Sequence, residues 1–238
     1  MLGRFLELSI PAADVAASLS FYRALGFSEL SVSDAWKSAY AVVSDGKLCL
    51  GLHDQSFEKP TLTFVYPGLR KHVRTLTDLG FKFTFQKLGD DEFNEVGFVD
   101  IDGNVVSLQE ARTFSPPADD IGPSLLGDWL ELSLPVRELA AAARFWAPLA
   151  PSILAYRESP ELHLRFAAAG MPIGLTESTM IDTPSLCFVC ADRASLAESI
   201  ETLGIAIDPD PGFEGSFARL QAPEGTQIYL FEADFARR

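Results

Sequence analysis

The chain contains one sequence pattern twice, and this repetition constrains its fold more than any other feature. The run FLELSIP over residues 5–11 returns as WLELSLP over residues 129–135. Other features recur in the same order, namely the aromatic pairs Phe21-Tyr22 and Phe145-Trp146, the glycines Gly51 and Gly174, and the turns Asp102-Gly103-Asn104 and Glu224-Gly225-Thr226. Internal repeats define an architecture before any single element is assigned. The 238 residues therefore predict a tandem duplication, with halves of roughly 115 residues that are each long enough to bury a core.

The sequence pattern of each half predicts two successive modules, each a strand and a helix followed by three strands. In the first module, Asp14 is suited to cap the start of the helix and Gly26 to close its end. The four helices are expected over residues 14–26, 67–79, 137–146 and 193–203. One helix on a few strands cannot enclose a core, so the modules must pair. We expect an α+β fold of four βαβββ modules, paired within each half into a curved mixed sheet with outer helices and an inner cleft.

The boundary between the halves is marked by composition. Residues 113–124 are rich in proline, glycine and small polar residues, as linkers are. This predicts a first domain over residues 1–113, a linker over 114–126 and a second domain over 127–238.

Charge limits the partners. The chain has 33 acidic and 19 basic residues, a formal charge of -14, which argues against a nucleic-acid partner. The excess of acidic residues suits a cationic ligand, but it is more often a solvated surface that keeps a protein in solution. No apolar run approaches the roughly 18 residues of a membrane span. The first residues lack the pattern of a signal peptide, so we expect a cytoplasmic protein that does not bind membranes.

The three cysteines, Cys49, Cys187 and Cys190, are expected to be buried thiols. Cys187 and Cys190 have the spacing of a redox pair, but they stand in a strand pattern. Strand alternation places their side chains on opposite faces of the sheet, which argues against a redox pair.

Two segments carry a family resemblance. They are DVAASLSFYRALGF over residues 14–27 and FVDIDGN over residues 98–104. Together with the module order, they resemble the vicinal oxygen chelate superfamily, the group of glyoxalase I, bleomycin-resistance proteins, fosfomycin-resistance enzymes and extradiol dioxygenases. The resemblance covers nearly the whole chain as two fused domains. It is clearest in the first half, because WAPLA over residues 146–150 and the turn at Pro223-Glu224-Gly225 depart from the family pattern.

This resemblance implies a divalent metal held by His, Gln or Glu side chains on the first and last strands of paired modules. The matching positions are Glu7, Gly51, Thr61 and Ser107 in the first half, and Glu131, Gly174, Ser185 and Tyr229 in the second. One carboxylate among such groups is too few to hold a transition metal. We therefore expect no metal and no other cofactor. Were a metal bound, Glu7 and His53 would be its first ligands, because alternation puts His53 on the same face as Gly51.

Glu7 and Glu131 are the strongest candidate site residues. Each stands mid-strand between leucines and faces the cleft that the resemblance implies, where an unpaired dry carboxylate is costly. Each is an anchor for a ligand, a general base, or the partner of a neighbouring Thr, Ser, Tyr or Arg. For Glu131, the hydroxyl of Tyr229 is the expected internal partner.

Among the histidines, His53 is the one expected near a cleft. His72 is assigned to a polar helix face, and a lone histidine such as His163 is more often structural. Trp36 belongs to a group of strand aromatics whose spacing suits either a cleft lining or plain core.

The leading interpretation is a metal-independent protein that binds and sequesters a small molecule, such as an antibiotic or toxin, similar to the bleomycin-resistance type; a cationic ligand is one option. The expected ligand contacts are Glu7, His53, Thr61, Ser107, Trp36, Glu131, Ser185 and Tyr229. One alternative is an enzyme, either a lyase or dioxygenase with an unorthodox metal site, or a metal-free lyase or isomerase with Glu7 or Glu131 as catalytic base. Another is an interaction scaffold whose clefts are filled by its own side chains. Both a monomer and a homodimer are compatible with the fused chain.

Overall fold

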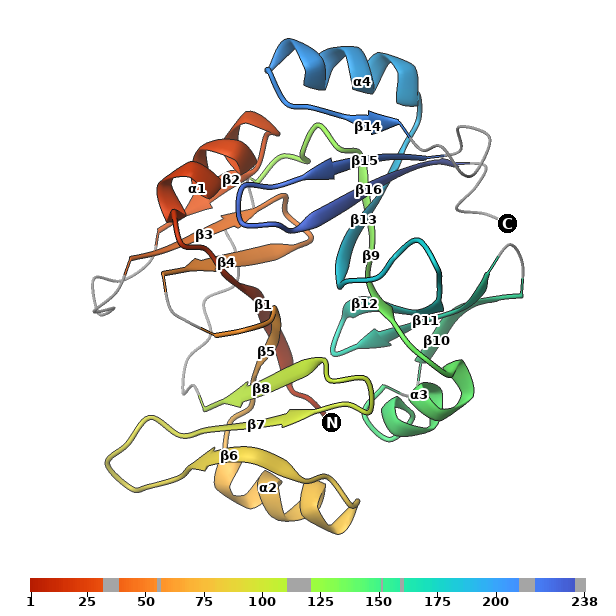
Figure 1. Ribbon diagram of the computed structural model, residues 1–238. Coiled ribbons are helices and arrows are strands. Elements are labelled where there is room, and N and C mark those ends of the chain that lie inside the picture. The colour runs from red at the N-terminus through yellow and green to blue at the C-terminus, as the bar shows by residue number, and fades with distance from the viewer. Residues whose placement is uncertain are drawn as a thin grey trace.

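The computed structural model describes residues 1–31, 39–54, 57–110, 121–150, 152–158, 161–209 and 217–233 (Figure 1). The first domain consists of β1 (Arg4–Pro11), α1 (Val15–Ala24), β2 (Ser28–Leu30), β3 (Tyr40–Ser44), β4 (Cys49–His53), β5 (Thr61–Val65), α2 (Leu69–Asp78), β6 (Phe83–Lys87), β7 (Glu95–Val99) and β8 (Val105–Gln109). The second domain consists of β9 (Asp128–Pro135), α3 (Leu139–Trp146), β10 (Ser152–Arg157), β11 (Leu162–Ala168), β12 (Met171–Glu177), β13 (Ser185–Cys190), α4 (Arg193–Thr202), β14 (Asp208–Pro209), β15 (Phe217–Gln221) and β16 (Gln227–Glu232). The predicted α+β fold of four βαβββ modules is confirmed.

Each domain is built on one mixed sheet of eight strands. The strand orders are β2-β3-β4-β1-β5-β8-β7-β6 and β10-β11-β12-β9-β13-β16-β15-β14. The first strands of the paired modules lie side by side at the centre of each sheet, because β1 runs antiparallel to β5 and β9 antiparallel to β13. The two modules of each half therefore join through their opening strands.

Alternation along β1 separates the two faces of the first sheet. Leu8 and Ile10 are buried in the main apolar core together with Tyr22 and Leu25 of the α1 segment. Glu7 and Ser9 point to the opposite, inner face and are also buried. The side chains of neighbouring strands follow the same parity, so a polar inner face lies opposite the apolar, helix-covered face.

The domains contact each other through two related turn-on-helix contacts. The turn between β15 and β16 places Glu224 against α1, where Ser18 Oγ and the Tyr22 hydroxyl donate hydrogen bonds of 2.6 and 2.7 Å to its carboxylate. The turn between β7 and β8 places Asp100 against α3, where Trp146 Nε1 donates a bond of 3.2 Å. Figure 1 shows each turn beside the helix of the other domain. The two apolar layers are continuous across this interface.

Several local predictions can be compared with the structure. Asp14 caps α1 by accepting a hydrogen bond from the Ala17 amide at 2.9 Å, as predicted. Cys187 and Cys190 are buried in apolar clusters on opposite faces of the second sheet, and all three cysteines are free. The assignment of His72 to a polar helix face is wrong, because its ring is 6% exposed and stacks on Tyr66 at 3.7 Å. No helix in the described ranges has the length and apolarity needed to cross a membrane.

Candidate functional site

Glu7 lies at the centre of a buried polar network in the first domain. Its Oε1 accepts hydrogen bonds from Ser9 Oγ at 2.7 Å and from His53 Nε2 at 2.8 Å. Its Oε2 accepts a short hydrogen bond from the hydroxyl of Tyr40. Ser9 in turn shares a hydrogen bond of 2.8 Å with Thr63 Oγ1. With 4% of its surface exposed, Glu7 is compensated entirely by side chains of its own domain.

Burial and the Glu7 charge act on the network's other members. They raise the pKa of the Tyr40 hydroxyl well above its ordinary value, burial being the larger cause. The same two causes, with burial again first, raise the pKa of the Cys49 thiol. Tyr40 therefore stays a hydrogen-bond donor across the physiological pH range.

Gly51 makes room for this carboxylate. A Cβ at this position would lie 2.2 Å from Oε1 of Glu7, far inside contact distance. The absence of a side chain thus lets Glu7 lie flat over β4 and reach His53 two residues further along. The glycine that repeats at position 174 has the same role, since its Cβ would lie 2.1 Å from Oε1 of Glu131.

The second domain has a carboxylate-imidazole pair of its own. Oε1 of Glu131 lies 2.7 Å from Nε2 of His163, and both residues are buried. The histidines come from different strands, because His53 is on β4 while His163 is on β11. In the sheet registers, Tyr40 lies opposite His53 and His163 lies opposite Thr176. His163 therefore occupies the position of Tyr40 in the repeat, and each domain supplies an imidazole to its glutamate by a different route.

Sequence reasoning did not find the His163 contact. The hydrogen bond predicted from Tyr229 to Glu131 is wrong, since the Tyr229 hydroxyl donates to the Met180 carbonyl at 3.2 Å. Cys187 lies between them, on the strand that separates β9 from β16. Aligning the β11 segment with the β3 segment would have placed His163 beside Glu131.

Glu131 is less completely compensated than Glu7. Its Oε2 accepts no hydrogen bond from the described residues, and Nε of Arg165 lies 4.0 Å away as an ion-pair partner. Burial, with the charge of Glu131 as the second cause, raises the pKa of the Cys187 thiol well above its ordinary value. Cys187 is therefore a neutral thiol and no nucleophile.

The remaining candidates do not gather round one point. Thr63, and not Thr61, lies opposite Glu7 in the β1-β5 register, and the Thr61 hydroxyl donates to the Lys59 carbonyl. Ser107 pairs with Thr63 in the register and donates to Glu95 at 2.9 Å. Ser185 donates to the Thr183 carbonyl. Trp36 lies outside the described residues.

The inner face of the second sheet is covered by the domain's own side chains. A separate apolar cluster there comprises Ile181, Cys187, Phe217, Tyr229 and Phe231, with Leu130 and Met180 packed against it. Tyr229 holds the segment between β12 and β13 against this face through its bond to Met180. The described side chains of the second domain therefore pack over the sheet face that carries Glu131.

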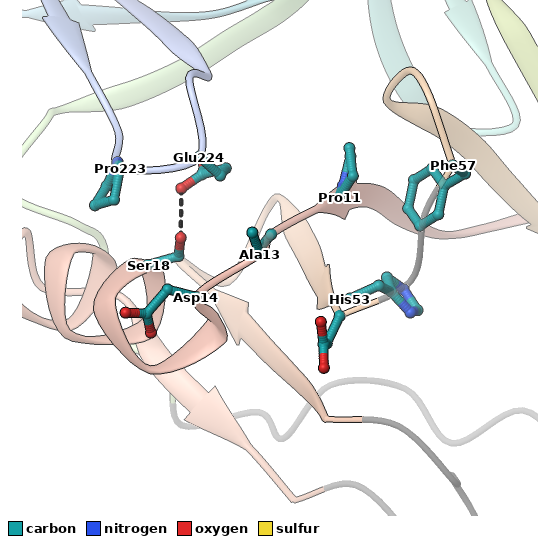
Figure 2. A pocket seen from close by; sticks show the side chains of 10 residues that line it. Pro11, Ala13, Asp14, Ser18, His53, Phe57, Pro223 and Glu224 are labelled. Carbon is teal, nitrogen blue, oxygen red and sulfur yellow. Dashed lines mark hydrogen bonds between the residues drawn. The ribbon is translucent and has the colours of Figure 1, made fainter.

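A pocket of about 680 Å³ lies at the end of the Glu7 network. Its lining comes from the β1-α1 connection, α1, the end of β4 with the connection that follows it, and the β15-β16 turn. The described lining residues are Pro11, Ala12, Ala13, Asp14, Ser18, His53, Asp54, Phe57, Pro223 and Glu224. Figure 2 shows Ser18 and the Pro223–Glu224 turn at one end, and His53 with Phe57 at the other. The His53 ring contacts Tyr40 at 4.4 Å and Phe57 at 5.7 Å between centroids.

Comparisons with known proteins give fold relatives but no sequence relatives. No family model matches the chain, and no curated protein matches it. A catechol 2,3-dioxygenase structure superposes with a TM-score of 0.62 at 12% identity, covering 98% of this chain and 88% of the other. A 2,2',3-trihydroxybiphenyl 1,2-dioxygenase from Sphingomonas wittichii gives 0.61 at 13%, covering 98% and 91%. The 2,3-dioxygenase LapB from a Pseudomonas species gives 0.62 at 13%, covering 98% and 94%.

These neighbours are extradiol dioxygenases, and they match both domains in one superposition. The chain has the fold of the vicinal oxygen chelate superfamily. At such low identity the likeness shows the fold alone. The vicinal oxygen chelate fold predicted from residues 14–27 and 98–104 is thus confirmed.

The metal that the vicinal oxygen chelate fold implies does not fit the side chains at the expected positions. In the first domain, three side chains already donate hydrogen bonds to the Glu7 carboxylate. The residues that lie opposite Glu7 on the next two strands, Thr63 on β5 and Ser107 on β8, offer only hydroxyl groups. In the second domain, the residues that lie opposite Glu131 on the next two strands are Cys187, a neutral thiol, and Tyr229, a phenol. Within the described residues, no group of three or more His, Cys, Asp or Glu side chains is arranged to hold a metal ion. Transition-metal sites need about three such ligands.

Proposed function

We propose that this chain is a metal-independent protein that binds a small molecule in the first domain, within a vicinal oxygen chelate fold. The observation that carries the proposal is the pocket of about 680 Å³ at the end of the Glu7 network. That volume lies within the roughly 300–1,000 Å³ of small-molecule sites. His53 joins the two features, because it lines the pocket and contacts Glu7 at 2.8 Å.

In this proposal Glu7 positions His53 and does not touch the ligand. Both carboxylate oxygens are engaged by side chains of the same domain, and 4% of the residue surface is exposed. The bond from His53 fixes the orientation of the imidazole at the pocket wall. The second domain, with its covered inner face, supports the first through the interdomain contacts.

One observation favours a second candidate function. An imidazole oriented by a buried carboxylate at the wall of a pocket has the arrangement of a general base and its positioning residue. A metal-free lyase or isomerase would then use His53, and not Glu7 or Glu131, to move a proton. In that case the same pocket would bind the substrate.

Native mass spectrometry of the gently purified protein, before and after dialysis against a chelator, tests the proposal. We expect a chain mass without stoichiometric metal, an unchanged melting temperature after chelation, and an organic molecule in the bound fraction. The released molecule, identified by its mass and incubated again with the protein, separates binding from catalysis. Conversion that His53→Gln abolishes would favour the second candidate. A stoichiometric metal whose removal lowers the melting temperature would contradict both.

A further inference from the structure

The pocket beside His53 is built from both domains. The first domain supplies the β1-α1 connection and the end of β4, and the second domain supplies Pro223 and Glu224 (Figure 2). Glu224 is held there by hydrogen bonds from Ser18 and Tyr22 of α1. The pocket is therefore complete only while the domains are docked.

The charged side chains among the described residues of the lining have one sign. Three carboxylates, those of Asp14, Asp54 and Glu224, line the pocket, and the part of the lining that the structure describes contains no lysine or arginine. Asp14 and Glu224 are used in hydrogen bonds within the protein. Asp54 is exposed, and its carboxylate has no hydrogen bond or ion pair within the described part of the chain. Carboxylates gathered round a concave surface concentrate a negative potential there.

Apolar groups line the rest of the pocket. Phe57 lies against the His53 ring, and Pro11 and Ala13 lie between the two ends of the pocket, whose lining also includes Ala12. An aromatic face attracts cations as well as apolar groups. This combination distinguishes an organic cation, with an apolar body and a positive head, from a hydrated metal ion.

We propose that the pocket binds an organic cation, an amine or quaternary ammonium with an apolar body, between the two domains. Asp54 and Glu224 recognise the positive charge from opposite domains, and Phe57 contacts the apolar body. This inference rests on the proposed function and adds the ligand class and the role of the second domain. Binding also couples to docking, because a ligand that contacts Glu224 stabilises the closed interface.

Three probes of equal length test the ligand class. These are 4-phenylbutylamine, 4-phenylbutanol and 4-phenylbutyrate, which carry a positive, a neutral and a negative head. Their affinities for the full chain are measured by titration in saturation-transfer NMR at pH 7. We expect the amine to bind about tenfold more tightly than the alcohol, and the butyrate to bind most weakly.

Substitutions in the lining then test which residues contact the probes. We expect Asp54→Asn and Glu224→Gln each to weaken the amine about three- to tenfold and to leave the alcohol unchanged. Phe57→Ala weakens both probes. The matched control Asp90→Asn removes a carboxylate that is 87% exposed and paired with Arg70, and changes neither. Ser18→Ala removes one hydrogen bond to Glu224 but keeps the charge of Glu224. If weaker domain docking alone lowers the affinity, this variant should weaken the amine and the alcohol equally.

The outcomes separate this inference from the proposed function. If the alcohol or the butyrate binds as tightly as the amine, the cation assignment is wrong while a small-molecule pocket remains. If Asp54→Asn and Glu224→Gln leave amine binding unchanged, the interdomain site is wrong. If none of the three probes binds, the organic-cation inference is overturned, whereas the proposed function stands or falls with the organic molecule in the native mass spectrum.

Discussion

The hydroxyl of Tyr22 in the first domain donates a hydrogen bond of 2.7 Å to Glu224 in the second. Its counterpart in the repeat, Trp146, donates to Asp100 of the first domain at 3.2 Å. The two contacts are therefore reciprocal. In each half, the second aromatic residue of the repeated pair donates a hydrogen bond to the turn before the last strand of the other half. Burial, followed by the charge of Glu224, raises the pKa of Tyr22 well above its ordinary value, so the phenol remains a donor.

Tyr22→Phe removes this hydrogen bond without changing the packing of the ring. Because Tyr22 is fully buried, we expect a loss of about 1–2 kcal/mol in the free energy of unfolding, measured with urea. The matched control is Tyr156→Phe, whose side chain is 57% exposed and makes a long bond of 3.4 Å to Glu158. That control should change stability by less than about 0.5 kcal/mol. Equal effects would show that the Tyr22 bond contributes nothing specific.

Glu7→Gln leaves one acceptor oxygen where the parent has two. Because an amide nitrogen cannot accept, the variant loses either the bond from the Tyr40 hydroxyl or the bonds from Ser9 and the His53 ring. We expect a destabilisation of about 1–3 kcal/mol. Glu131→Gln should cost less, since among the described residues the His163 ring is the one side chain that donates a hydrogen bond to that carboxylate. The control Glu198→Gln, on the exposed surface of α4, should lie within about 0.5 kcal/mol of the parent. The ranking is wrong if Glu131→Gln is the more damaging change.

Gly51→Ala places a methyl group 2.2 Å from the Glu7 carboxylate, which must then leave β4 and its bond to His53. Overpacking of this kind costs about 1–3 kcal/mol. Gly122→Ala is the matched control, because nothing lies within 4 Å of its added Cβ. Chemical denaturation of both variants checks the prediction. A Gly51→Ala protein as stable as the control would mean that the carboxylate does not need this space.

The thiols should react slowly. Burial is the largest cause that raises the pKa of Cys49, Cys187 and Cys190, and only the thiolate is nucleophilic. With Ellman's reagent at pH 8, we expect the half-buried Cys49 to react first and Cys187 last. All three react at once after unfolding in guanidinium. Fast reaction of Cys187 in the folded protein would contradict its burial.

His72 should make the protein less stable in acid. Burial lowers its pKa below the ordinary value of about 6.5, so it stays neutral in the fold at pH values where the unfolded chain gains a proton. Its contribution is complete above pH 6.5 and is lost as the pH falls through the lowered pKa. We expect His72→Gln to lose less stability than the parent between pH 7.5 and pH 5, measured by urea midpoints. Parallel losses in the two proteins would exclude His72 as the cause.

The repeat carried most of the fold prediction. Matching Glu7 with Glu131 and Gly51 with Gly174 gave four modules, and alternation placed Cys187 and Cys190 on opposite faces. The contacts of the two glutamates were harder to predict. His53 was found because it follows Gly51 on the same strand, whereas His163 was missed because it reaches Glu131 from a neighbouring strand.

By itself, the sequence determined the modules, their pairing within each half, and the strands that carry the buried carboxylates. These follow from local rules, namely strand and helix periodicity, helix capping and repetition along the chain. Only the tertiary structure decided which side chains complete each carboxylate, and that Glu224 helps to form the pocket beside His53 in the other domain. Such contacts depend on sheet register and domain docking, which bring together residues more than 200 positions apart, as in the Ser18–Glu224 bond with its separation of 206.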